Sequence, residues 1–142
     1  MIAGTAAIFI LLALAGIHVY WAAGGTAGKA AAVPSVNERP VLRPSAKTTA
    51  MVSLGLAGMA AWLAVSIGWP ALPAFPALHL LLQIGVWLMA AIFALRAIGD
   101  FRYVGFFKRI RSSRFARLDT WAYSPLCACL AVLIGMSAIT AR

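Results

Sequence analysis

The chain has 142 residues, of which 63% are hydrophobic and 11% are charged, and it carries a formal net charge of +9. Soluble domains are about half apolar and about a quarter charged, so this composition excludes an ordinary soluble domain. A large positive charge in a soluble protein would indicate nucleic-acid binding, but basic residues that flank apolar segments also orient membrane proteins. We therefore expect an integral membrane protein that does not bind nucleic acid.

Four apolar runs are long enough to cross a bilayer, which takes about 20 helical residues. They cover residues 2–23, 48–67, 77–98 and 123–139. No Lys or Arg precedes the first run, and the run is longer than the apolar region of a signal peptide, so we interpret it as a mature helix. The sequence predicts an all-α fold in which residues 1–142 form a single membrane domain, a four-helix bundle, with no separate soluble domain.

The segments between the spans differ in composition. Residues 24–47 are rich in Gly, Pro and charge, which indicates a loop, whereas Pro70, Pro73 and Pro76 punctuate a short uncharged turn. Residues 99–122 combine cations with Phe and Tyr, as expected of a chain that lies in the plane of the membrane interface. The second span contains small residues that predict a surface for close helix approach. They are Ser53, Gly55, Ala57, Gly58 and Ala61.

The distribution of charge predicts an orientation. The segments after the first and third spans must lie on the same side of the membrane, and together with Arg96 they contain every Lys and Arg except Arg142. Because positive loops stay inside, we expect both segments in the cytoplasm and both termini outside.

Three polar motifs lie near this basic side. The first motif, His18-Val19-Tyr20-Trp21, ends the first span. In the second motif Arg96 and Asp100 are four residues apart and could pair along a helix. In the third motif Asp119 is placed to neutralise an arginine, and Pro125 fits a first helical turn. The candidate ligand-binding residues are His18, Tyr20, Trp21, Arg96, Asp100, Arg102, Tyr103, Asp119 and Tyr123.

These side chains allow two interpretations. An ionisable group within an apolar span is a functional-site candidate by default, and Arg, Asp, His and Tyr above an apolar floor suit an amphipathic ligand with an anionic head. Alternatively, the charged groups neutralise one another and anchor the bundle, and His18 is a hydrogen-bonding residue at a helix end. The sequence leaves both interpretations open.

The sequence predicts no metal and no cofactor. Cys127 and Cys129 would point to nearly opposite faces of a helix, so we expect no disulfide but two small buried apolar residues, and further zinc ligands are lacking. His18 and His79 should differ in membrane depth by roughly 20 Å, too far for one haem to bridge, although a single-His haem site stays open.

Three stretches of the sequence are similar to a known family. They read H-x-Y-W-A-x-G-G from His18, R-A-x-G-D-F-R-Y-V-G-F-F-K-R from Arg96 and F-A-R-x-D-T-x-x-Y-S-P-L-C from Phe115. They resemble the bacterial membrane family catalogued as domain of unknown function 3995, over almost the whole chain. The resemblance implies a small four-helix integral membrane protein of a bacterial inner membrane and brings no established activity.

The first functional hypothesis is a non-enzymatic binding or accessory protein that contacts anionic lipid headgroups, another membrane protein or a second copy of itself. The alternative is an intramembrane enzyme for a lipid or isoprenoid, with His18 as acid or base and Arg96 or Arg102 holding a phosphate or carboxylate, although no nucleophile triad or Gly-rich phosphate loop is recognisable. The third is a small dimeric transporter. Coupled transport usually needs an ionisable group near the bilayer midplane, and no Asp or Glu lies inside a predicted span.

Overall fold

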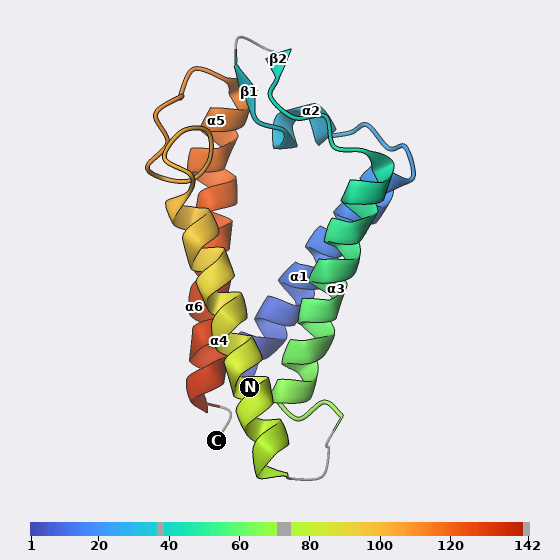
Figure 1. Cartoon of the computed structure of the whole chain (residues 1–142), viewed down its shortest axis with the longest axis vertical. Coiled ribbons are helices and arrows are strands. Elements are labelled where there is room, and N and C mark those ends of the chain that lie inside the picture. Colours follow the sequence, from blue (N-terminus) through green and yellow to red (C-terminus); the bar gives the residue numbers. More distant parts are fainter. Residues whose placement is uncertain (37–38, 71–74, 141–142) are drawn as a thin grey trace.

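The computed structural model describes residues 1–36, 39–70 and 75–140, so that Glu38, Pro73 and Arg142 lie outside the described residues. Its long helices are α1 (Ile2–Ala22), α3 (Ala46–Ser66), α4 (Pro76–Ile98) and α6 (Ser124–Thr140) (Figure 1). The short elements are α2 (Lys29–Ala32), the antiparallel strands β1 (Ser35–Val36) and β2 (Arg39–Pro40), α5 (Arg114–Leu118) and the π-helical turn η1 (Asp119–Tyr123). The predicted all-α four-helix bundle is confirmed.

Three spans begin and end within two residues of their predicted bounds, because the local signals at their ends are strong. Ser45 caps α3 by accepting a hydrogen bond from the Thr48 N–H, at 3.1 Å. Pro76 opens α4, where its missing N–H is not needed. Each of these helices is long and apolar enough to cross a membrane.

The fourth span differs from the prediction at its start. The helix begins at Arg114 rather than near residue 123, because the Ser113 hydroxyl accepts the Ala116 N–H and caps a helix that continues through α5, η1 and α6. Pro125 is the second residue of α6, in agreement with the predicted first turn, but α6 follows the widened π turn without a break in the helix. Asp119 also lies inside this continuous helix, four residues before the start of the predicted span.

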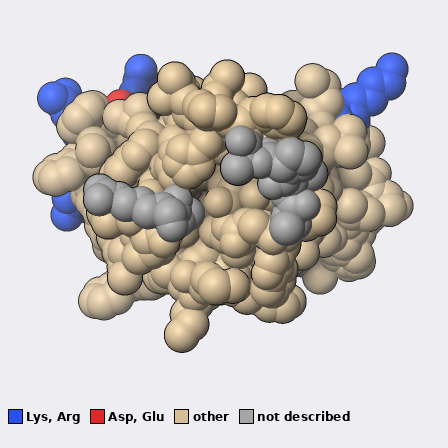
Figure 2. Space-filling model, turned by 90° about the horizontal axis from the view of Figure 1, so that it is seen from below, with Lys and Arg blue, Asp and Glu red and all other residues tan. Residues whose placement is uncertain are grey.

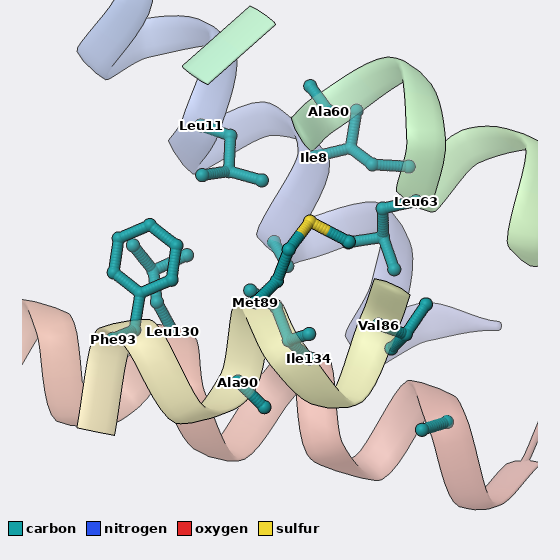
Figure 3. Close-up of a cluster of buried hydrophobic side chains, with 12 residues drawn as sticks. Ile8, Leu11, Ala60, Leu63, Val86, Met89, Ala90, Phe93, Leu130 and Ile134 are labelled. Atoms are coloured by element: carbon teal, nitrogen blue, oxygen red, sulfur yellow. The ribbon is translucent and has the colours of Figure 1, made fainter. Parts of the chain in front are cut away.

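The four long helices associate as two pairs. Most contacts between them join α1 to α3 and α4 to α6, with fewer between α1 and α6 and between α3 and α4. Figure 1 shows the pairs close together at one end and diverging toward the end that holds α2, the strands and α5. The core lies where the pairs meet: Figure 3 shows Met89 of α4 pointing toward Ile8 of α1 and Leu63 of α3.

The outward faces of the helices are apolar, as lipid contact requires. Large side chains such as Leu54, Leu80 and Leu88 are mostly exposed. The small-residue surface predicted on α3 is only partly a helix contact in the described part of the chain. Its Ser53 is buried against α1 and donates to the Ala15 carbonyl at 2.9 Å, whereas nothing lies within 4 Å of a Cβ built at Gly55 or Gly58.

Charge is concentrated at one end of the bundle. Residues 24–36, 39–45 and 99–113 lie together at the end where the helix pairs diverge, which we call the basic end, and the start of α1 and the end of α6 lie toward the opposite end (Figure 1). Viewed from that opposite end, the surface of the described residues is almost free of charged side chains, and their Lys and Arg project only at its rim (Figure 2). The two basic segments thus share one end, while its location in the cytoplasm stays a prediction.

Candidate functional site

Asp119 is the centre of a buried ionic cluster. Its side chain is fully buried and accepts hydrogen bonds from Arg96 Nη2 to Oδ1 at 2.9 Å and from Lys108 Nζ to Oδ2 at 3.0 Å. The Gly105 N–H also donates to Oδ2, at 2.7 Å. The prediction that Asp119 neutralises an arginine is confirmed. We call Arg96, Lys108 and Asp119 the Asp119 cluster.

Lys108 is the other buried charge of this cluster, and its hydrogen-bonding capacity is fully used. Besides Asp119, its ammonium donates to the Gly105 carbonyl at 2.9 Å and to the Thr120 hydroxyl at 2.7 Å. An ammonium group has three donors, so none is left for a ligand. Arg96 differs, since its side chain is 35% exposed and its buried Nη1 has no hydrogen-bond partner among the described residues.

Asp100 does not pair with Arg96, contrary to the possibility raised by their spacing. Helix α4 ends at Ile98, and the carboxylate of Asp100 turns back onto its own loop. Its Oδ1 accepts the N–H groups of Arg102, Tyr103 and Val104 at 2.9, 2.7 and 2.9 Å. Burial acts to raise the pKa of this carboxyl, but these amide hydrogen bonds outweigh it and hold the pKa below its ordinary value.

The loop after α4 folds back onto the helix end. The Phe106 N–H donates to the Ala97 carbonyl at 2.8 Å, and Gly99 and Gly105 adopt positive φ angles of 95° and 90°. A Cβ at Gly105 would collide with the backbone of Ile98 and Gly99. Of residues 99–122, residues 99–113 thus form this loop and residues 114–122 are helical, while their place in the membrane interface stays a prediction.

We expect Gly105→Ala to lower the free energy of unfolding by about 1–3 kcal/mol, because it adds a backbone clash to an unfavourable φ. Thermal unfolding in detergent, followed by circular dichroism, measures this loss. Gly16→Ala is the matched control, since a Cβ there meets open space on an exposed helix face and should be neutral or slightly stabilising. Equal effects of the two substitutions would contradict the tight loop closure.

A cavity of about 880 Å³ opens at the basic end, between residues 26–44 and residues 112–117. Its cationic lining residues are Lys29, Arg43, Arg114 and Arg117, and its hydroxyl-bearing lining residues are Thr26, Ser35, Ser112 and Ser113. We call it the basic cavity. In the described part of the chain both salt bridges belong to Asp119, so none of these four cations has a carboxylate partner there.

A smaller cavity of about 130 Å³ adjoins the basic cavity and shares Lys29, Val33 and Pro44 with it. It lies between the end of α1 and the start of α3, and His18 and Trp21 line it. The His18 Nδ1 is 2.8 Å from the Leu14 carbonyl, and the His18 ring lies edge-on to the Trp21 ring, 5.2 Å away. His18 is thus a helix-end hydrogen bonder that also faces a cavity.

The chain matches the model of a known protein family. A family model described as a protein of unknown function (DUF3995) matches residues 11–134. The chain belongs to this family. Neither a curated protein nor a solved structure matches it. The DUF3995 match covers both segments that line the basic cavity and every member of the Asp119 cluster, so these features lie within the family region.

The predicted ligand-binding residues occupy separate places in this DUF3995 chain. The Tyr20 hydroxyl accepts the Ala27 N–H at 3.4 Å, and the Arg102 guanidinium lies over the Tyr103 ring at 5.1 Å. The Tyr123 hydroxyl donates to the Ala31 carbonyl at 3.3 Å and joins α2 to the fourth span. His18 and Trp21 line the small cavity, whereas Arg96 and Asp119 belong to the Asp119 cluster. Ligand contact by any of them stays a prediction.

Sequence reasoning missed the residues that line the basic cavity, and it missed Lys108. Nothing in its local spacing separates buried Lys108 from exposed Arg109. Both cysteines are free, but only Cys127 is partly buried, and the expectation of two buried side chains is wrong for exposed Cys129. Its neighbour Leu130 takes the core-facing position of that helix turn.

Proposed function

We propose that this four-helix membrane protein is a non-enzymatic binding protein for an anionic membrane amphiphile, whose headgroup occupies the basic cavity. The observation that carries the proposal is a cavity of about 880 Å³ lined by four cations and four hydroxyl-bearing side chains. Guanidinium and ammonium groups are the usual protein donors to phosphate and carboxylate. The cavity volume falls within the range of about 300–1,000 Å³ common for ligand sites.

The position of the cavity suits a ligand that stays in the bilayer. It lies at the end of the membrane-spanning helices, where a headgroup can enter while its tail remains among lipids. The adjoining small cavity is mostly apolar and offers room for the group nearest the head. We propose that His18 and Trp21 contact the ligand there.

The Asp119 cluster supports this site without supplying the anion contacts. Its carboxylate and its lysine are already paired, so an added anion would compete with Asp119 for Lys108. Through Gly105 and Thr120 the cluster ties the loop after α4 to the helix that begins at Arg114. It therefore positions Arg114 and Arg117 in the cavity wall.

The proposal is tested by native mass spectrometry of the protein from nanodiscs of phosphatidylcholine that contain phosphatidylglycerol. Loss of Arg114 and Arg117 in a double Ala variant should reduce retention of the anionic lipid about tenfold or more, since it removes charge-assisted hydrogen bonds to the headgroup. The control is the Lys47→Ala/Arg109→Ala variant, which loses the same charge at exposed positions outside both cavities and should change retention clearly less, because it leaves those hydrogen bonds in place.

Equal losses in the two double variants would contradict a defined headgroup site and indicate general surface attraction. The same preparations address the enzyme alternative through His18→Ala. If the protein merely binds lipid, this variant alters retention modestly and the wild type leaves the lipid chemically unchanged. If the wild type converts the lipid and His18→Ala abolishes this conversion, the enzymatic proposal would replace the binding proposal.

A further inference from the structure

We infer that the headgroup held by the basic cavity is multiply charged, a diphosphate or a closely spaced pair of phosphates, rather than a single phosphodiester. The inference rests on the proposed function and specifies its ligand class. It comes from the number of cations that line one cavity without a carboxylate partner among the described residues, and from the hydrogen-bond donors that they carry.

The first step concerns counterions. The described carboxylates are Asp100 and Asp119, and both are occupied: Asp119 by Arg96 and Lys108, Asp100 by the backbone amides of its own loop. No carboxylate is among the described residues that line the basic cavity. Among the described residues, its four cations therefore have no carboxylate partner.

The second step compares ligand charges. Like charges gathered around a concave surface raise its positive potential and attract anions in proportion to their charge. A phosphodiester with one negative charge would leave most of the positive charge of the cavity unbalanced. A diphosphate, with a charge of about −3 near neutral pH, would balance most of it.

The third step compares hydrogen bonds. Each guanidinium presents a planar fork of N–H groups that fits two phosphate oxygens, and the three arginines that line the cavity come from two segments, Arg43 from the loop before α3 and Arg114 and Arg117 from α5. A phosphodiester offers only its pair of unesterified oxygens, whereas a diphosphate monoester offers more than twice as many. Lys29 and the hydroxyls of Ser112 and Ser113 add further donors. The donor set thus exceeds what a phosphodiester can accept.

The test is competition in phosphatidylcholine nanodiscs at physiological salt, with farnesyl diphosphate, farnesyl monophosphate, phosphatidylglycerol and inorganic diphosphate as probes. Farnesyl diphosphate should bind the wild type about tenfold or more tightly than farnesyl monophosphate or phosphatidylglycerol. The preference should fall below about threefold in Arg114→Ala/Arg117→Ala and persist in Lys47→Ala/Arg109→Ala. Circular dichroism of each variant establishes that it is folded.

Equal affinities of the wild type for farnesyl diphosphate and phosphatidylglycerol would overturn this inference and leave the proposed function intact. Binding of none of the anionic probes would overturn both. Inorganic diphosphate distinguishes the source of the headgroup. If inorganic diphosphate binds more weakly than farnesyl diphosphate, the result supports an amphiphile as the ligand. If the two bind equally, the preference for diphosphate stands, but the membrane amphiphile of the proposed function is overturned.

Discussion

Asp119→Ala should lower the free energy of unfolding by about 3–5 kcal/mol, the usual loss when a buried ion pair is deprived of one partner. The substitution leaves the Lys108 ammonium in a fully buried position without its counterion. It also removes the acceptor for the Gly105 N–H and for Arg96 Nη2. Denaturant titration in detergent micelles, read by tryptophan fluorescence and circular dichroism, measures the loss.

Two further variants separate a missing counterion from a general effect of truncation. Lys108→Met/Asp119→Leu removes both buried charges and should be more stable than Asp119→Ala, although it carries one more substitution. Asp100→Ala is the matched carboxylate control, because Asp100 is exposed and holds only its own loop. If Asp119→Ala cost no more than Asp100→Ala, the Asp119 cluster would not be what holds the basic end together.

The spans could be predicted closely from the sequence because lipid imposes a simple requirement, a long uninterrupted apolar helix. The predicted runs 2–23 and 48–67 match the helices Ile2–Ala22 and Ala46–Ser66 to within two residues at each end. At the fourth span hydropathy located the apolar run but not the start of the helix, which lies earlier in the chain. The cap at Ser113 lies well before the apolar residues, so polar Arg114 and Asp119 are helical too.

The site was less accessible to sequence reasoning, because its partners depend on the path of the loops. Asp119 had several arginines within plausible reach, and its pairing with Arg96 and Lys108 follows from the close approach of Gly99 and Gly105. The cations of the basic cavity come from segments that meet only after the helix pairs assemble. Sequence spacing could place these charges on one side of the membrane but could not place them around one cavity.

The inward faces of the helices were also hidden from the sequence, since each span is apolar on all sides. Leu130→Ala tests the assignment made by the structure, in which Leu130 is fully buried and Val132 is 59% exposed. We expect Leu130→Ala to cost about 2 kcal/mol, the low end of the usual range of about 2–5 kcal/mol for Leu→Ala in a core. The low end applies because a leucine side chain is as well solvated by lipid as by the interior of the bundle. The loss of stability therefore comes mainly from lost packing contacts. Denaturant titration in detergent micelles gives the value.

Val132→Ala is the control on the same helix, with a side chain that faces outward. It should change the free energy of unfolding by less than about 0.5 kcal/mol, because no packed neighbour loses its contacts. A larger cost at Val132 than at Leu130 would reverse the faces of α6. Leu130 packs in the core where α4 and α6 meet the other helix pair. The α4–α6 pairing would therefore be wrong, and so would the divergence of the helix pairs that forms the basic cavity.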